Sequence, residues 1–137
     1  MRTWVYDPHS GGVKIPKSVQ ERTRQRILAY AEAHYAGTYL RIDVRFRGPF
    51  CYIDAHREPY VTTPPPGSRE SREEFLERLR NTPTHLGRLR YFGNEESWSY
   101  AFYTYSHERY EPCVLDSGKF QGTPEEGFAT GAVYLRE

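Results

Sequence analysis

The sequence has few cysteines and no long apolar run, and each shortage excludes a class of protein. Cys51 and Cys113 are the only cysteines among 137 residues, too few for a disulfide framework and not spaced as a CxxC motif. No segment approaches the ~18 consecutive apolar residues of a membrane span, and residues 1–6 lack the regions of a signal peptide. We therefore expect a small soluble cytoplasmic protein with reduced thiols and no membrane partner.

The sequence also lacks an excess of charge of either sign, because 19 basic and 18 acidic residues leave a formal net charge of only +1. The overall charge therefore predicts no general attraction to nucleic acid or membranes. The positive charge is nearly all arginine, with 16 arginines against three lysines, and tyrosine is abundant at 12 residues. Arginine binds phosphate bidentately and stacks on aromatic rings better than lysine does. A surface that combines the two residue types is therefore the feature to look for.

Apolar periodicity and capping residues predict an α+β fold. The expected elements are a strand at 2–6, a helix at 18–37, strands at 39–47 and 51–56, a helix from 71 to 81, and strands at 86–92 and 97–105. This βαββαβ order is typical of the ferredoxin-like split βαβ, an antiparallel sheet with two helices on one face. A C-terminal strand and short helix would be additions to that arrangement.

The length of the chain predicts one domain over residues 1–137, since single domains commonly span roughly 100 to 200 residues. Residues 1–109 would form the core of sheet and helices. Residues 110–137 would form a C-terminal strap or lid. The proline-rich segment 58–67 is too short to separate domains and is expected to be an extended connection.

Strict alternation along the strands predicts which side chains share a face of the sheet. Pairing Phe46 with Cys51 across the first hairpin places Asp43 opposite Asp54. Leu40, Ile42 and Val44 would then face the core, and the charged residues that alternate with them would face the other way. The second face, which we call the Arg/Tyr face, is predicted to carry Arg41, Arg45, Arg47, Tyr52, Arg88, Arg90, Tyr103 and Tyr105.

An open sheet with arginines and tyrosines is typical of proteins that bind single-stranded nucleic acid, since guanidinium groups pair with phosphates and rings stack on bases. The leading hypothesis is a small non-enzymatic binding module for single-stranded RNA or DNA, without a cofactor. A second hypothesis is a structural or regulatory subunit that forms a homodimer or binds a protein partner through this face. A third is that the face is covered by apolar residues of the C-terminal segment, including Phe128 and Leu135.

Asp43 and Asp54, with His56 and Arg41 one pair further along, form a candidate catalytic group. Two facing carboxylates can hold Mg²⁺ or Mn²⁺ or share a proton, and neighbouring arginines can orient a phosphate. This alternative predicts a metal-dependent phosphodiesterase or nuclease. The same carboxylates also suit ordinary ion pairs with the arginines, so dependence on a divalent ion separates the two interpretations.

Overall fold

The computed structural model describes residues 11–135 of the chain. Its elements are α1 (Lys17–Tyr35), β1 (Arg41–Arg47), β2 (Phe50–His56), α2 (Arg72–Asn81), β3 (Thr84–Tyr91), β4 (Trp98–Thr104), β5 (Arg109–Cys113), β6 (Gln121–Gly122), α3 (Pro124–Gly131) and the 3-10 helix η1 (Ala132–Leu135). The strand predicted at residues 2–6 lies outside the described residues. Within them, no helix combines the length and the apolar character needed to span a bilayer.

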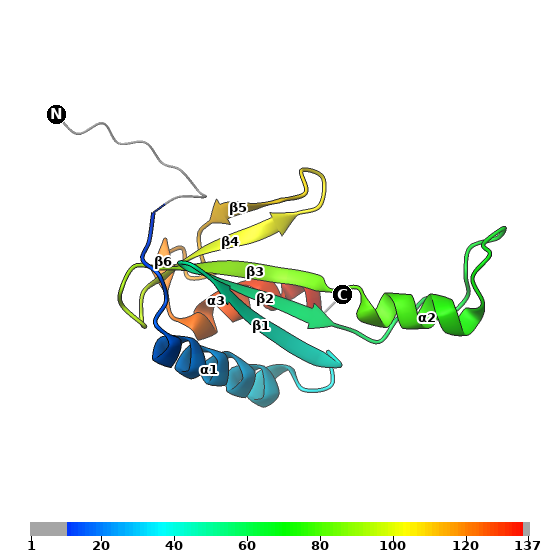
Figure 1. The fold of residues 1–137 in the computed structure, drawn as a ribbon, viewed down its shortest axis with the longest axis horizontal. Coiled ribbons are helices and arrows are strands. Elements are labelled where there is room, and N and C mark those ends of the chain that lie inside the picture. The colour runs from blue at the N-terminus through cyan, green and yellow to red at the C-terminus, as the bar shows by residue number, and fades with distance from the viewer. Residues whose placement is uncertain (1–10, 136–137) are drawn as a thin grey trace.

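The predicted α+β class is confirmed as a six-stranded antiparallel sheet with three α-helices (Figure 1). The strands follow one another in the order β1-β2-β3-β4-β5, and β6 pairs with β4. The ferredoxin-like topology is not confirmed, because β2 pairs directly with β3, whereas that topology places another strand between them. Alternation shows where strands run but carries no information on which strands are neighbours.

The predicted register of the first hairpin is confirmed, with Phe46 opposite Cys51 and Asp43 opposite Asp54. In the later hairpin Tyr91 lies opposite Trp98, as the alternation also predicts. Both hairpins have one apolar face, so a slip of one residue would expose the buried set. Burial of that face therefore fixes the register.

Helices α1 and α3 cover the same face of the sheet (Figure 1) and close the core there. Ile27 of α1, Trp98 of β4 and Phe128 of α3 are all 0% exposed. The Phe128 ring lies 5.4 Å from that of Tyr35. The C-terminal segment thus belongs to the core, and the alternative in which Phe128 and Leu135 cover the Arg/Tyr face is wrong.

Helix α2 does not lie on the sheet but extends past the ends of β2 and β3 (Figure 1), contrary to the prediction of two helices on one face. Its start was predicted correctly, since Ser71 and Glu74 form a reciprocal capping box. Arg80 and Glu58, whose Nη2 and Oε1 atoms are 2.6 Å apart, join the helix to the preceding loop. The helix has few apolar positions, and Phe75 is its buried residue, so little surface drives it onto the sheet.

A β-bulge in β3 interrupts the pairing with β2. The register shifts between Ile53 and Asp54, so that Gly87 faces Ile53 while His85 faces Asp54. The extra residue, Leu86, has its backbone oxygen bound by the Tyr100 hydroxyl, at 2.6 Å in the core. A bulge redirects the side chains that follow it, and here it turns His85 onto the Arg/Tyr face.

Ion pairs tie α1 to the turn between β3 and β4. Arg22 donates to Glu95 at 2.9 Å, and Arg26 donates to Glu96 at 2.7 Å and to Glu125 at 2.8 Å. Arg26 therefore bridges carboxylates of the turn and of α3. These contacts fix the position of α1 over the sheet edge.

The Arg22 pair gives a prediction for Glu95. The hydrogen bond from Arg22 lowers the pKa of the Glu95 carboxyl, so Arg22→Ala is expected to raise that pKa toward its ordinary value. Because the folded-state pKa is depressed, the pair stabilises the fold above the pKa of the unfolded carboxyl and stops doing so as the pH falls through the folded value. NMR titration of the Glu95 side chain in the native protein and in Arg22→Ala measures the two pKa values. Arg78→Ala is the control, because Arg78 instead lowers the pKa of Glu70; a Glu95 pKa unchanged by Arg22→Ala would contradict the pairing.

Candidate nucleic-acid interface

The Arg/Tyr face lies on the side of the sheet opposite α1 and α3. The registers align Arg45 of β1, Tyr52 of β2 and Arg88 of β3 in one row across the strands. Phe50 and Arg90 form part of the next row. Every predicted member is brought to this face or its border: Arg41, Arg45, Arg47, Tyr52, Arg88, Arg90 and Tyr103 on the strands, with Tyr105 just after β4.

The arginines of this face fall into an exposed set and a buried set. On the edge strand β1, the side chains of Arg41 and Arg45 are each 59% exposed. On the central strand β3, Arg88 and Arg90 are only 5% and 7% exposed, and burial lowers the pKa of the Arg88 guanidinium. The β1 arginines are therefore open to solvent, while the β3 arginines are buried within the face.

Aromatic rings lie against arginines of both sets. The Arg88 guanidinium carbon lies 4.1 Å from the centroid of the Phe50 ring and 5.4 Å from that of Tyr110. Arg45 lies 4.6 Å above Tyr52. Cation–π contacts of this kind add to packing and orient the planar guanidinium. Phe50 and Tyr110 were not predicted as members of the face, because Phe50 was assigned to a turn and Tyr110 lies outside every predicted strand.

Asp54 is a carboxylate buried within this face, at 5% exposed. Its Oδ1 lies 2.7 Å from His85 Nδ1, and its Oδ2 lies 3.4 Å from Arg45 Nε. His85 was missed by the sequence analysis, because regular alternation assigns it to the core side of β3. The glycine at position 87 is the signal that could have found it, since glycine inside a strand often marks a bulge.

Asp43 and His56 form a second polar group beside the first. Asp43 Oδ2 lies 3.1 Å from His56 Nε2, and Arg41 Nε lies 3.2 Å from Asp43 Oδ1. His56 Nδ1 donates to the backbone oxygen of Arg80 at 2.9 Å, and His56 is only 5% exposed. Both nitrogens of the His56 ring are thus engaged, and the ring is buried, as is typical of a histidine with a structural role.

The two facing aspartates are therefore each engaged with separate partners. Asp43 contacts Arg41 and His56, whereas Asp54 contacts His85 and Arg45. Among residues 11–135 there is no group of three or more His, Cys, Asp or Glu side chains that could hold a metal ion. Binding of Mg²⁺ or Mn²⁺ between the aspartates, as in the phosphodiesterase alternative, would require them to leave these partners.

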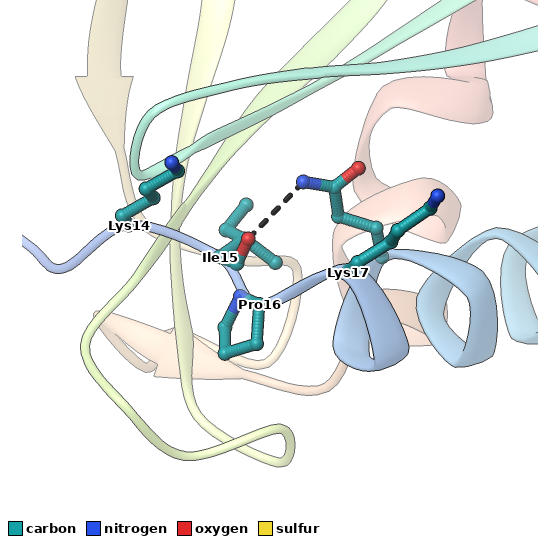
Figure 2. Close-up of a pocket in the computed structure, with 5 residues that line it drawn as sticks. Lys14, Ile15, Pro16 and Lys17 are labelled. Carbon is teal, nitrogen blue, oxygen red and sulfur yellow. Dashed lines mark hydrogen bonds between the residues drawn. The ribbon is translucent and has the colours of Figure 1, made fainter.

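A surface pocket at the start of α1 is separate from the Arg/Tyr residues. Lys14 and Lys17 line it, and Gln20 donates across it to the backbone oxygen of Ile15 at 3.1 Å (Figure 2). Helix α1 begins after Pro16, without a side-chain cap. Pro16 is itself the N-cap residue and has an extended backbone, with φ −60° and ψ 151°. Because two lysines line this pocket, an experiment on anion binding has to distinguish it from the Arg/Tyr face.

Comparison of the chain with protein-family models, with curated proteins and with solved structures gives no match in any of the three. Function is therefore inferred from the geometry of this chain. That geometry defines an α+β domain whose sheet has one face closed by helices and one face of arginines and aromatic rings.

Proposed function

We propose that the chain binds single-stranded nucleic acid through the Arg/Tyr face. The observation that supports this most is the imbalance of charge on a face that neither α1 nor α3 covers. On the exposed strand β1 alone, three arginines point to this face, at 41, 45 and 47, against one aspartate, at 43. An anionic ligand would neutralise the excess.

The arrangement of the exposed arginines suits a phosphate backbone. Arg41, Arg45 and Arg47 point to the same face of β1, where residues two apart are separated by about 7 Å. Each guanidinium offers several donors in a planar fork, which matches the oxygens of a phosphate. A row of such donors along one edge strand favours an extended chain of phosphates over a single anion.

The rings favour a single strand over a duplex. Tyr105 is 56% exposed, and its ring contacts those of His85 and Tyr103 at 6.2 Å and 4.9 Å. Rings contribute about 1–3 kcal/mol per stacked base, but only where the base is unpaired and accessible. With the phosphates along β1, the bases would reach across the neighbouring strands toward Tyr105.

The proposal is tested by fluorescence anisotropy of labelled single-stranded RNA and DNA at ~50 mM and ~200 mM salt. Each lost phosphate contact reduces the slope of log affinity against log salt by about 0.7. Arg45→Ala/Arg47→Ala is therefore expected to weaken binding and to reduce the slope by about 1.4. Lys17→Ala/Arg69→Ala removes the same charge from exposed positions elsewhere and should leave the slope unchanged.

Two results would contradict the proposal. One is the absence of binding at ~50 mM salt. The other is an equal loss in both double variants, which would show a response to net charge alone. In either case, light scattering at micromolar concentration tests the hypothesis of a structural subunit, since a stable homodimer would support self-association through this face.

A further inference from the structure

The Asp54–His85 pair has the geometry of an oriented base. A carboxylate only accepts hydrogen bonds, so the 2.7 Å contact with Asp54 Oδ1 places the ring proton of neutral His85 on Nδ1. The lone pair is then on Nε2, and no hydrogen bond engages Nε2 within the described part of the chain. The His85 side chain is 23% exposed, so a ligand on the face can reach it.

Three tyrosines restrict the His85 ring. Its centroid lies 4.5 Å from that of Tyr103, 6.2 Å from that of Tyr105 and 6.1 Å from that of Tyr110. The backbone N–H of His85 also donates to the Tyr105 hydroxyl at 3.2 Å. The imidazole is therefore held in one orientation beside the most exposed ring of the face.

Neutralising Asp54 does not by itself explain this arrangement. Arg45 already supplies a cation to the other carboxylate oxygen, 3.4 Å away. His85 reaches Asp54 only because of the bulge at Leu86, which the core holds through the Tyr100 hydroxyl. Bulges are frequent beside active sites, where they redirect a side chain.

We infer that the Asp54–His85 pair cleaves single-stranded RNA without a metal ion, using the ribose 2′-hydroxyl as nucleophile. This rests on the proposed nucleic-acid function and extends it from binding to catalysis. His85 Nε2 is the general base, and Asp54 is a positioning residue that fixes its tautomer. Arg45, on the second oxygen of Asp54, is placed to stabilise the negative charge of the transition state.

The step is an internal transesterification. His85 takes the proton of the 2′-hydroxyl, the 2′-oxygen bonds to phosphorus, and the bond from phosphorus to the 5′-oxygen breaks. The 5′-oxygen takes a proton from solvent, and His85 returns its proton to solvent. The products are a 2′,3′-cyclic phosphate and a 5′-hydroxyl end, and no metal or further reactant is consumed. DNA lacks the nucleophile, so it would bind without being cleaved.

The test combines cleavage and binding on the same protein, with 5′-labelled single-stranded RNA in excess EDTA. We expect fragments ending in 2′,3′-cyclic phosphate from RNA and none from DNA of the same sequence. His85→Gln is expected to lower the rate by about 100-fold or more with little change in anisotropy. His107→Gln is the matched control, because His107 pairs with Glu111 outside this face and should leave the rate unchanged.

Asp54→Asn tests the positioning role separately. It is expected to lower kcat while leaving KM nearly unchanged, because the β1 arginines bind the RNA. Nitrogen NMR of the His85 ring should show the proton on Nδ1 in the native protein and a loss of that preference in the variant. A native ring without that preference would contradict the role assigned to Asp54.

The outcomes separate the two proposals. Binding without cleavage in EDTA overturns the catalytic inference and leaves the binding function in place, whereas absence of binding overturns both. Cleavage that persists in folded His85→Gln, or that requires Mg²⁺, also overturns the inference. A circular dichroism melt of each variant establishes that it is folded, and His85→Ala provides a second variant if His85→Gln is not.

Discussion

Replacing Gly131 with alanine is expected to destabilise the fold by about 3 kcal/mol, although the same change inside a helix ordinarily stabilises by up to ~1 kcal/mol. Gly131 lies in α3, and a Cβ there would overlap the backbone oxygen of Leu86. It would also come within 2.9 Å of the Tyr100 hydroxyl. Neither group can move freely, because the Tyr100 hydroxyl donates a hydrogen bond to the Leu86 oxygen at 2.6 Å in the core.

Urea denaturation measures this effect, with Gly118→Ala as a control. Gly118 has a positive φ of 83° but open space around its Cα, so alanine there should cost only about 1 kcal/mol. A Gly131→Ala protein as stable as the native one would show that α3 does not approach β3 as closely as described. The bulge would then lack this support from the core.

Replacing Gly87 with alanine is expected to cost about 2–4 kcal/mol and to displace His85 from Asp54. A Cβ at position 87 would overlap the Tyr100 ring, which is 3% exposed and has its hydroxyl bound to Leu86. Either the ring leaves its site or the bulge changes shape. RNA cleavage is therefore expected to fall together with stability.

A double-mutant cycle with Tyr100→Val identifies the cause. If the ring is the obstacle, Gly87→Ala should cost clearly less in the Tyr100→Val background than in the native one, because touching residues are strongly coupled. The cost that remains there is the backbone strain of alanine at the positive φ of 158°. Urea denaturation of the four proteins gives the coupling energy. Equal costs in both backgrounds would mean that Tyr100 does not hold the bulge.

Local patterns predicted the parts of this fold that depend on neighbours in sequence. The alternation of residues 41–47 gave both the strand and its pairing, including Asp43 opposite Asp54. The capping box at Ser71 marked the start of α2. These features depend on which face is buried and on side chains three residues apart, and both are visible in one sequence.

The features that could not be predicted depend on contacts between distant segments. Helix α2 has capping residues but few apolar positions, so its sequence does not say what it packs on. Phe128 is apolar wherever it packs, and only tertiary structure assigns it to the α1 side. His85 changed faces because a single extra residue at Leu86 reverses the alternation.

The sequence therefore predicted many of the residues that share the face, but not their exposure or their partners. The arginines and tyrosines of the face were identified from alternation, but their exposure was not. Arg88 and Arg90 are buried, and their guanidinium groups lie over the Phe50 ring, which the alternation did not place. The aspartates were placed correctly as a facing pair. Their partners were not, because His85 reaches Asp54 through the bulge and His56 is held by the backbone of Arg80.

The most direct test of the proposed interface is an NMR titration of the ¹⁵N-labelled protein with an unlabelled single-stranded oligouridine RNA. Binding through the Arg/Tyr face predicts chemical-shift changes concentrated on β1, β2 and β3 and at Tyr105, with the helices α1 and α3 unaffected. Changes confined to the pocket at Lys14 and Lys17, or to the helical side of the sheet, would contradict it.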